Sequence, residues 1–146
     1  MRLILAAIAC MLTPLAAYAQ APGPGTDVER VTLQPGESAS FTLAKGFDHQ
    51  LLQRAAPDAK GAITVRYEVA GGRSRITAVS RTGYPTVFTV LADRDGNGGY
   101  EAMGDVSLPG DGTPGTRDWP GTLGTINVGD FLGGPHGDHD HAPSGE

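Results

Sequence analysis

The sequence predicts an all-β fold: a small antiparallel β-sandwich of about seven or eight short strands. The clearest evidence is the segment 63–70, in which Ile63, Val65, Tyr67 and Val69 alternate with polar residues. Four apolar residues at a period of two are typical of a strand with one buried face. The 22 glycines and 11 prolines agree with this prediction, because they suit short strands joined by tight turns.

Two strands are expected earlier in the chain, at Val31–Leu33 and Ser40–Leu43. Pro35-Gly36 between them suits a type II turn, since glycine tolerates a positive φ at the second central position. The two segments form either a strand pair or a strand–corner–strand. Residues 31–43 (VTLQPGESASFTL) also resemble the opening strand pair of immunoglobulin-like sandwiches, without the cysteine that such domains often carry there. The resemblance implies a fold class and transfers no function.

The stretch Phe47–Ala59 has two interpretations. It could form a short helix capped by Asp48 and ended by Pro57. It could instead form a strand at His49–Arg54, followed by a turn. The all-β surroundings favour the strand.

A hairpin and a central strand are expected after the clear strand. Gly71-Gly72 closes a hairpin to a strand at 75–81. Thr82-Gly83 then turns the chain into the segment 84–91, which is apolar on both faces around Val87 and Phe88 and therefore predicts a strand in the middle of its sheet.

The last part of the domain alternates once more and then becomes rich in turns. After a loop at 92–99, the residues Tyr100, Ala102, Gly104, Val106 and Leu108 are expected on one face of a strand. Residues 109–120 (PGDGTPGTRDWP) are expected to be a long loop. A final strand is expected at 123–128, with an apolar patch at 131–132.

The first nineteen residues have the pattern of a cleaved signal peptide. Arg2 supplies a positive charge, residues 3–12 are apolar, and Ala17-Tyr18-Ala19 offers a cleavage site after Ala19. We therefore expect an exported protein, periplasmic or extracellular, with no transmembrane segment. A lipid anchor at Cys10 is disfavoured, because the apolar stretch before it is very short and Ala7 stands where a lipobox usually has leucine.

The rest of the chain divides into three parts. Residues 20–27 are expected to form a Pro/Gly-rich flexible leader, residues 28–132 the β-sandwich domain, and residues 133–146 a His/Asp-rich tail predicted to be disordered.

The second half of the chain is acidic: from residue 93 onward it has 2 basic and 10 acidic residues. This acidic balance disfavours nucleic acid as a partner, since phosphates need a basic surface.

The tail is a candidate transition-metal site. Neutral imidazole and carboxylate together suit Zn²⁺, Cu²⁺ or Ni²⁺, and a flexible segment can wrap around one ion. A polar, solubilising tail is the alternative. The candidate ligands are His136, Asp138, His139, Asp140 and His141.

A second candidate site, for calcium, lies in the loop after residue 92. Oxygen donors at Asp93, Asp95 and Asn97, followed by Gly98, match the first half of an EF-hand-like calcium loop. The usual twelfth-position glutamate is absent, and Glu101 is the expected substitute. The alternative is a plain hairpin loop, because Asp-Gly and Asn-Gly are favoured turn pairs.

No catalytic constellation is evident, so we expect no enzymatic activity. Asp48 and His49 form an acid–imidazole pair, but neighbours on a strand point to opposite faces. The sequence therefore favours an exported, non-catalytic binding or structural module of the periplasm or cell surface, whose partner is a protein or another envelope component. A metal-handling accessory protein is the alternative, and a hydrolase with a hidden site is the least favoured.

Overall fold

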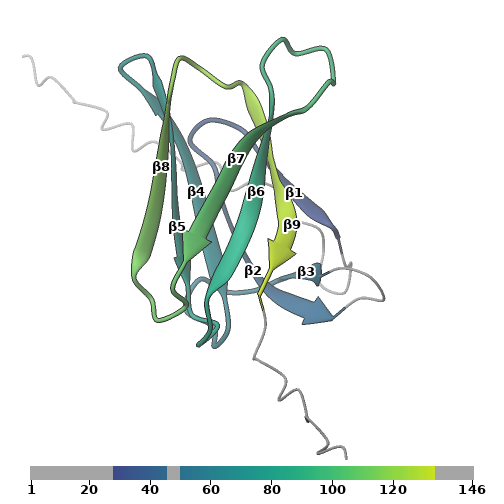
Figure 1. The fold of residues 1–146 in the computed structure, drawn as a ribbon, viewed down its shortest axis with the longest axis vertical. Coiled ribbons are helices and arrows are strands. Elements are labelled where there is room, and N and C mark those ends of the chain that lie inside the picture. Colours follow the sequence, from purple (N-terminus) through teal and green to yellow (C-terminus); the bar gives the residue numbers. More distant parts are fainter. Residues whose placement is uncertain (1–27, 46–49, 134–146) are drawn as a thin grey trace, which may run out of the picture.

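The computed structural model describes residues 28–45 and 50–133, which form nine strands and no helix (Figure 1). The signal peptide, the Pro/Gly leader, the Asp48–His49 pair and residues 134–146 of the tail lie outside these residues. The strands are β1 (Arg30–Leu33), β2 (Ser38–Lys45), β3 (Gln50–Arg54), β4 (Ile63–Ala70), β5 (Arg73–Ser80), β6 (Thr86–Asp93), β7 (Glu101–Leu108), β8 (Pro114–Pro120) and β9 (Thr125–Leu132).

The strands build two antiparallel sheets that pack face to face, which confirms the predicted β-sandwich. One sheet has the order β1-β9-β6-β7 and the other the order β3-β2-β4-β5-β8. This order differs from the ABED and CFG sheets of immunoglobulin domains. The immunoglobulin resemblance of residues 31–43 therefore does not extend to the connectivity of the whole domain.

Alternate side chains of both sheets fill the space between them. The largest fully buried ones include Tyr67, Phe41 and Phe88. Phe131 joins the aromatic group, with its ring centroid 5.3 Å from that of Phe41 and 5.2 Å from that of Phe88. No disulfide is needed in a domain of this size, because apolar burial alone can stabilise it.

The turn at Pro35-Gly36 is a corner between the two sheets. The amide of Glu37 donates to the carbonyl of Gln34 at 3.0 Å, and Gly36 has a φ of 89°. Both features fit the predicted type II turn. Because β1 belongs to one sheet and β2 to the other, the strand–corner–strand interpretation is confirmed over the strand pair.

The next elements follow the sequence prediction. Gln50–Arg54 is a strand rather than a helix, paired with β2. The hairpin of β4 and β5 turns at Gly71 and Gly72, whose φ angles of 58° and 71° are those of a type I′ turn. The segment apolar on both faces, β6, lies between β9 and β7 as predicted.

The predicted face of β7 is wrong in its first half. Val90 pairs with Gly104 but Leu91 pairs with Ala102, so Met103 is an extra residue on β7. This β-bulge shifts the alternation by one residue. Ala102 and Tyr100 are consequently exposed, whereas Val106 and Leu108 are buried as expected.

The long loop predicted at residues 109–120 is also wrong, because its second half is the edge strand β8. Pro114 to Pro120 pair with Val79 to Arg73 of β5. Only Trp119 of this strand is buried, so no apolar alternation signals it. Proline is tolerated here because an edge strand needs hydrogen bonds on one side only.

The last strand runs further than predicted, from Thr125 to Leu132. A second bulge lies opposite β6, where Asp130 adopts a φ of 52° and pairs with Arg30 at 3.1 Å. The bulge turns Phe131 into the core, whereas Leu132 is 70% exposed.

Candidate functional site

The predicted calcium loop joins β6 to β7 and projects from one end of the sandwich (Figure 1). Asp93, the last residue of β6, is 9% exposed. Its two carboxylate oxygens accept hydrogen bonds from the amides of Asn97 at 3.1 Å and Gly98 at 2.9 Å. The side-chain oxygen of Asn97 accepts from the amide of Gly99 at 2.7 Å. These oxygens therefore hold the turn together.

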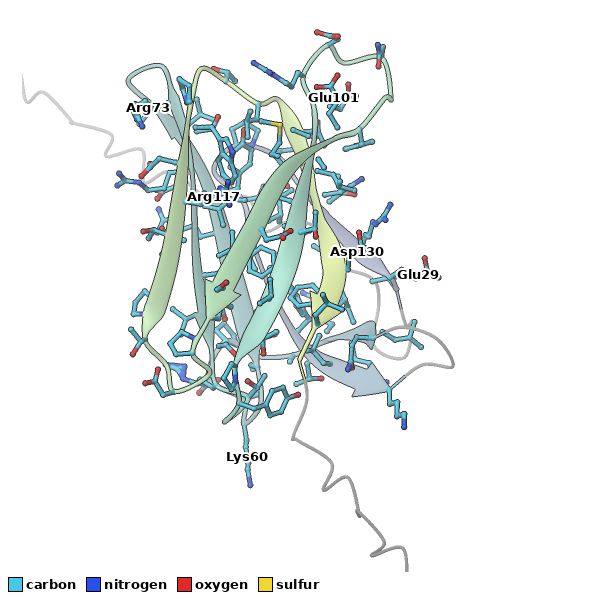
Figure 2. All side chains as sticks on the ribbon, in the orientation of Figure 1. Glu29, Lys60, Arg73, Glu101, Arg117 and Asp130 are labelled. Carbon is cyan, nitrogen blue, oxygen red and sulfur yellow. The ribbon has the colours of Figure 1, made fainter. Side chains whose placement is uncertain are left out.

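Of the other two candidate calcium ligands, Asp95 is exposed in the same loop, and Glu101 is exposed at the start of β7, where Figure 2 shows it. Across residues 28–45 and 50–133, no group of three or more His, Cys, Asp or Glu side chains is arranged to hold a metal ion. The structure thus places the four predicted residues in this loop and at its two ends, and gives Asp93 and Asn97 backbone partners. Calcium binding stays a prediction.

The candidate transition-metal ligands of the tail lie outside the described residues. They are His136, Asp138, His139, Asp140 and His141. Transition-metal binding by the tail also stays a prediction.

A different group of polar side chains gathers on the outer face of the five-stranded sheet. Since Ile63, Val65 and Tyr67 point into the core, the residues between them on β4 point outward. The pairing of β4 with β5 and of β5 with β8 places outward residues in rows across three strands. We call this surface the arginine face; its members are Arg66, Glu68, Arg73, Arg75, Thr77, Thr116 and Asp118.

One row of the arginine face is Glu68, Arg75 and Asp118, on three neighbouring strands. The guanidinium of Arg75 donates twice to the carboxylate of Asp118, Nε to Oδ1 at 2.7 Å and Nη2 to Oδ2 at 3.3 Å. The hydrogen bond from Arg75, followed by its charge and that of Arg73, lowers the pKa of Asp118. The same hydrogen bond raises the pKa of Arg75. Asp118 is therefore charged throughout the neutral range.

The neighbouring positions add two more cations. Arg66 forms an ion pair with Glu68, two residues along the same strand, at 2.8 Å. Arg73 stands at the hairpin end of the face (Figure 2). The guanidinium side chains of Arg66 and Arg75 are 62% and 57% exposed. Ion pairs this exposed add little to stability, because water and salt screen them, so folding alone does not require them.

Alternation predicts the outward direction of the β4 and β5 members, but no sequence motif marks them as a site. Asp118 and Thr116 could not be placed, because residues 109–120 were expected to form a loop. The sequence signal that could have indicated this edge strand is a pair of prolines separated by five residues, with a single tryptophan before the second.

A small recess lies elsewhere, between β1, β2 and β3. Val31, Phe41, Leu52 and Arg54 are among the residues that line it, and it has room for about one water molecule, at about 10 Å³. This volume is far below the several hundred Å³ of a typical ligand pocket.

Comparisons with known proteins give little further information. No protein-family model and no curated protein matches the chain. One solved structure that it resembles is the Avr2 effector protein from the fungal plant pathogen Fusarium oxysporum, at 16% sequence identity and a TM-score of 0.37, covering 75% of this chain and 94% of that one. We draw neither fold nor function from a similarity this distant. The described residues also include no helix long and apolar enough to span a membrane.

Proposed function

We propose that this chain is an exported, non-catalytic binding module of the periplasm or cell surface, and that it binds an envelope component through the arginine face. The observation that carries the proposal is the concentration of three arginines and two carboxylates on one outer surface formed by β4, β5 and β8. Export is supported by the pattern of residues 1–19.

The chemistry of this face suits a polar partner that carries charges. A guanidinium group presents several donors in a fixed plane and can bind a carboxylate or phosphate group through two parallel hydrogen bonds. The ion pairs with Glu68 and Asp118 orient Arg66 and Arg75 without burying them. The hydroxyls of Thr77 and Thr116, which are paired neighbours on β5 and β8, lie beside the charged row. Salt should weaken such an interface, since exposed charges are screened.

The experiment compares two triple variants that remove the same charge. The first variant removes the positive charges of the arginine face by combining Arg66→Gln, Arg73→Gln and Arg75→Gln. The matched control changes three exposed cations that lie off this face, Arg30, Lys60 and Arg94, to glutamine. Each purified protein is mixed with envelope fragments of its own host, and the bound fraction is measured by sedimentation at low and moderate salt.

We expect the wild-type protein and the control to sediment with the envelope and to be released by salt, and the arginine-face variant to stay in solution. Equal binding by all three proteins would place the interface elsewhere. Equal loss by both variants would mean that net charge, not this face, causes binding. Turnover of a generic ester, phosphate or glycoside substrate by the wild-type protein would refute the non-catalytic part.

Metal handling is the second candidate function, supported by the spacing of His136, His139 and His141 in the tail. Calorimetric titration with Zn²⁺, with and without residues 135–146, tests it, and equal heats would remove it. Calcium binding near Asp93 is tested separately, because an ion held by the native state raises the melting temperature. Identical melting in calcium and in chelator would remove that site.

A further inference from the structure

The strands β7 and β8 are each the last strand of their sheet, and they face each other on one side of the sandwich (Figure 1). In the described part of the chain, β7 pairs with β6 alone. Its other side presents backbone carbonyls and amides that could pair with a strand of another molecule. Proteins with such an edge need a feature that prevents this association.

Two side chains of β8 bind these carbonyls. The indole Nε1 of Trp119 donates to the carbonyl of Met103 at 3.1 Å, and Nη1 of Arg117 donates to the carbonyl of Asp105 at 2.5 Å. The guanidinium carbon of Arg117 also lies 5.6 Å from the ring centroid of Trp119, within range of a cation–π contact. Figure 2 shows Arg117 on β8, beside β7.

Glycines allow β8 to lie this close to β7. A Cβ at Gly104 would meet Nη2 of Arg117 at 2.6 Å, and the residue has a φ of 111°. A Cβ at Gly115 of β8 would meet the carbonyl oxygen of Ser107 at 2.9 Å. Both positions therefore need a residue without a side chain.

The outer edge of β8 is protected in a different way. The amide of Gly121 donates to the carbonyl of Gly72 at 2.7 Å, which continues the ladder with β5 and shows that the odd-numbered residues of β8 face that strand. Pro114 and Pro120 consequently occupy outward positions, where a proline offers no N–H to a neighbouring strand.

We propose that Arg117 and Trp119 form a clasp that keeps β7 from pairing with β7 of a second copy of this chain, and so keeps the protein monomeric. An antiparallel second β7 would use the carbonyls of Met103 and Asp105 as acceptors. The clasp occupies both. The inference is independent of the proposed function, because neither clasp residue belongs to the arginine face.

The test removes the two donors and retains bulk. Trp119→Phe keeps an aromatic ring in the core, and Arg117→Met keeps a long side chain without the guanidinium. The molar mass is measured by light scattering over a range of concentrations. We expect the wild-type protein to show the monomer mass throughout, and the double variant to reach at least twice that mass as concentration rises.

Two further measurements separate association from unfolding. Arg117→Met alone leaves the buried tryptophan in place, so it tests the clasp with the core intact, and we expect weaker but measurable association. In the associated double variant, the amides of β7 should gain protection from hydrogen exchange while those of β4 stay protected. Asp118→Asn, on the opposite face of β8, is the matched control and should remain monomeric.

The proposal is overturned if the double variant is folded and monomeric at every concentration. It is also overturned if the wild-type protein already associates through β7, or if Asp118→Asn associates as strongly as the double variant.

Discussion

Replacing Phe131 with alanine tests the bulge that turns β9. Without the extra residue beside Asp130, the alternation of Ile126 and Val128 would put Phe131 on the outer face. In the structure Phe131 is 4% exposed and its ring lies 5.2–5.3 Å from two other phenylalanine rings. Truncating a buried phenylalanine to alanine costs about 3–5 kcal/mol. Leu132→Ala, at a side chain 70% exposed, should cost less than about 0.5 kcal/mol.

Urea unfolding followed by fluorescence measures both variants, because Trp119, the single tryptophan of the chain, is 8% exposed and reports on the core. With a slope of about 2 kcal/mol per molar urea, Phe131→Ala should lower the midpoint by about 2 M. Phe131→Leu, which retains most of the volume, should fall in between and remain measurable if the alanine variant does not fold. Equal losses for Phe131→Ala and Leu132→Ala would refute the bulged register.

Three further predictions concern the turn, the clasp and the arginine face. Asp93→Ala should lower the free energy of unfolding by about 2 kcal/mol, because two backbone amides lose their carboxylate acceptor. The amides of Asn97 and Gly98 should then exchange their hydrogens faster, and unchanged exchange would contradict the assigned bonds. Gly104→Ala should destabilise the domain by about 1–2 kcal/mol through its positive φ and the clash with Arg117, and Arg117→Met should relieve part of that loss in the double variant. The pKa of Asp118 is lowered in the folded protein, so the stabilisation from its pair with Arg75 is present above the unfolded pKa of 3.8 and is lost as the pH falls through the folded pKa. Titration of the Asp118 carboxyl by NMR should show a higher pKa in Arg75→Met than in the wild-type protein. An unchanged pKa would contradict the ion pair.

Local alternation was enough to predict the strands that bury one complete face. The segment Ile63–Ala70 was predicted with the bounds that β4 has, because its apolar residues fall at every second position. The central place of β6 followed from apolar residues on both of its faces. These signals depend only on residues close together in the chain, so they survive without knowledge of the partner strands.

Elements that depend on distant partners could not be predicted in the same way. The strand β8 buries Trp119 alone, so its pattern resembles that of a loop, and its pairing with β5 is a long-range event. The bulge at Met103 also leaves no sequence pattern, because Met103 is an extra residue only in relation to the residues of β6 that it pairs beside. The missed strand β8 affected the candidate site, since Asp118 on it contacts an arginine 43 residues away in the sequence.

The candidate calcium ligands show that one sequence pattern can suit two different structural roles. The spacing of Asp93 and Asn97 fits a calcium loop, but the same oxygens equally suit hydrogen bonds to the amides of a glycine-rich turn, which is how the structure uses them. Composition and spacing alone do not distinguish these uses, because both need oxygen acceptors beside residues with positive φ.

The arginine face exists only if β8 pairs with β5 in the register that sets Asp118 opposite Arg75. Nuclear Overhauser contacts between the Hα protons of these two residues, and between those of Thr77 and Thr116, measure this directly, since Hα protons approach closely in the antiparallel pairs that are not hydrogen-bonded. We predict both contacts. Their absence in the folded protein, with the amides of Arg117 and Trp119, which face β5, exchanging as freely as those of a loop, would contradict the proposed surface.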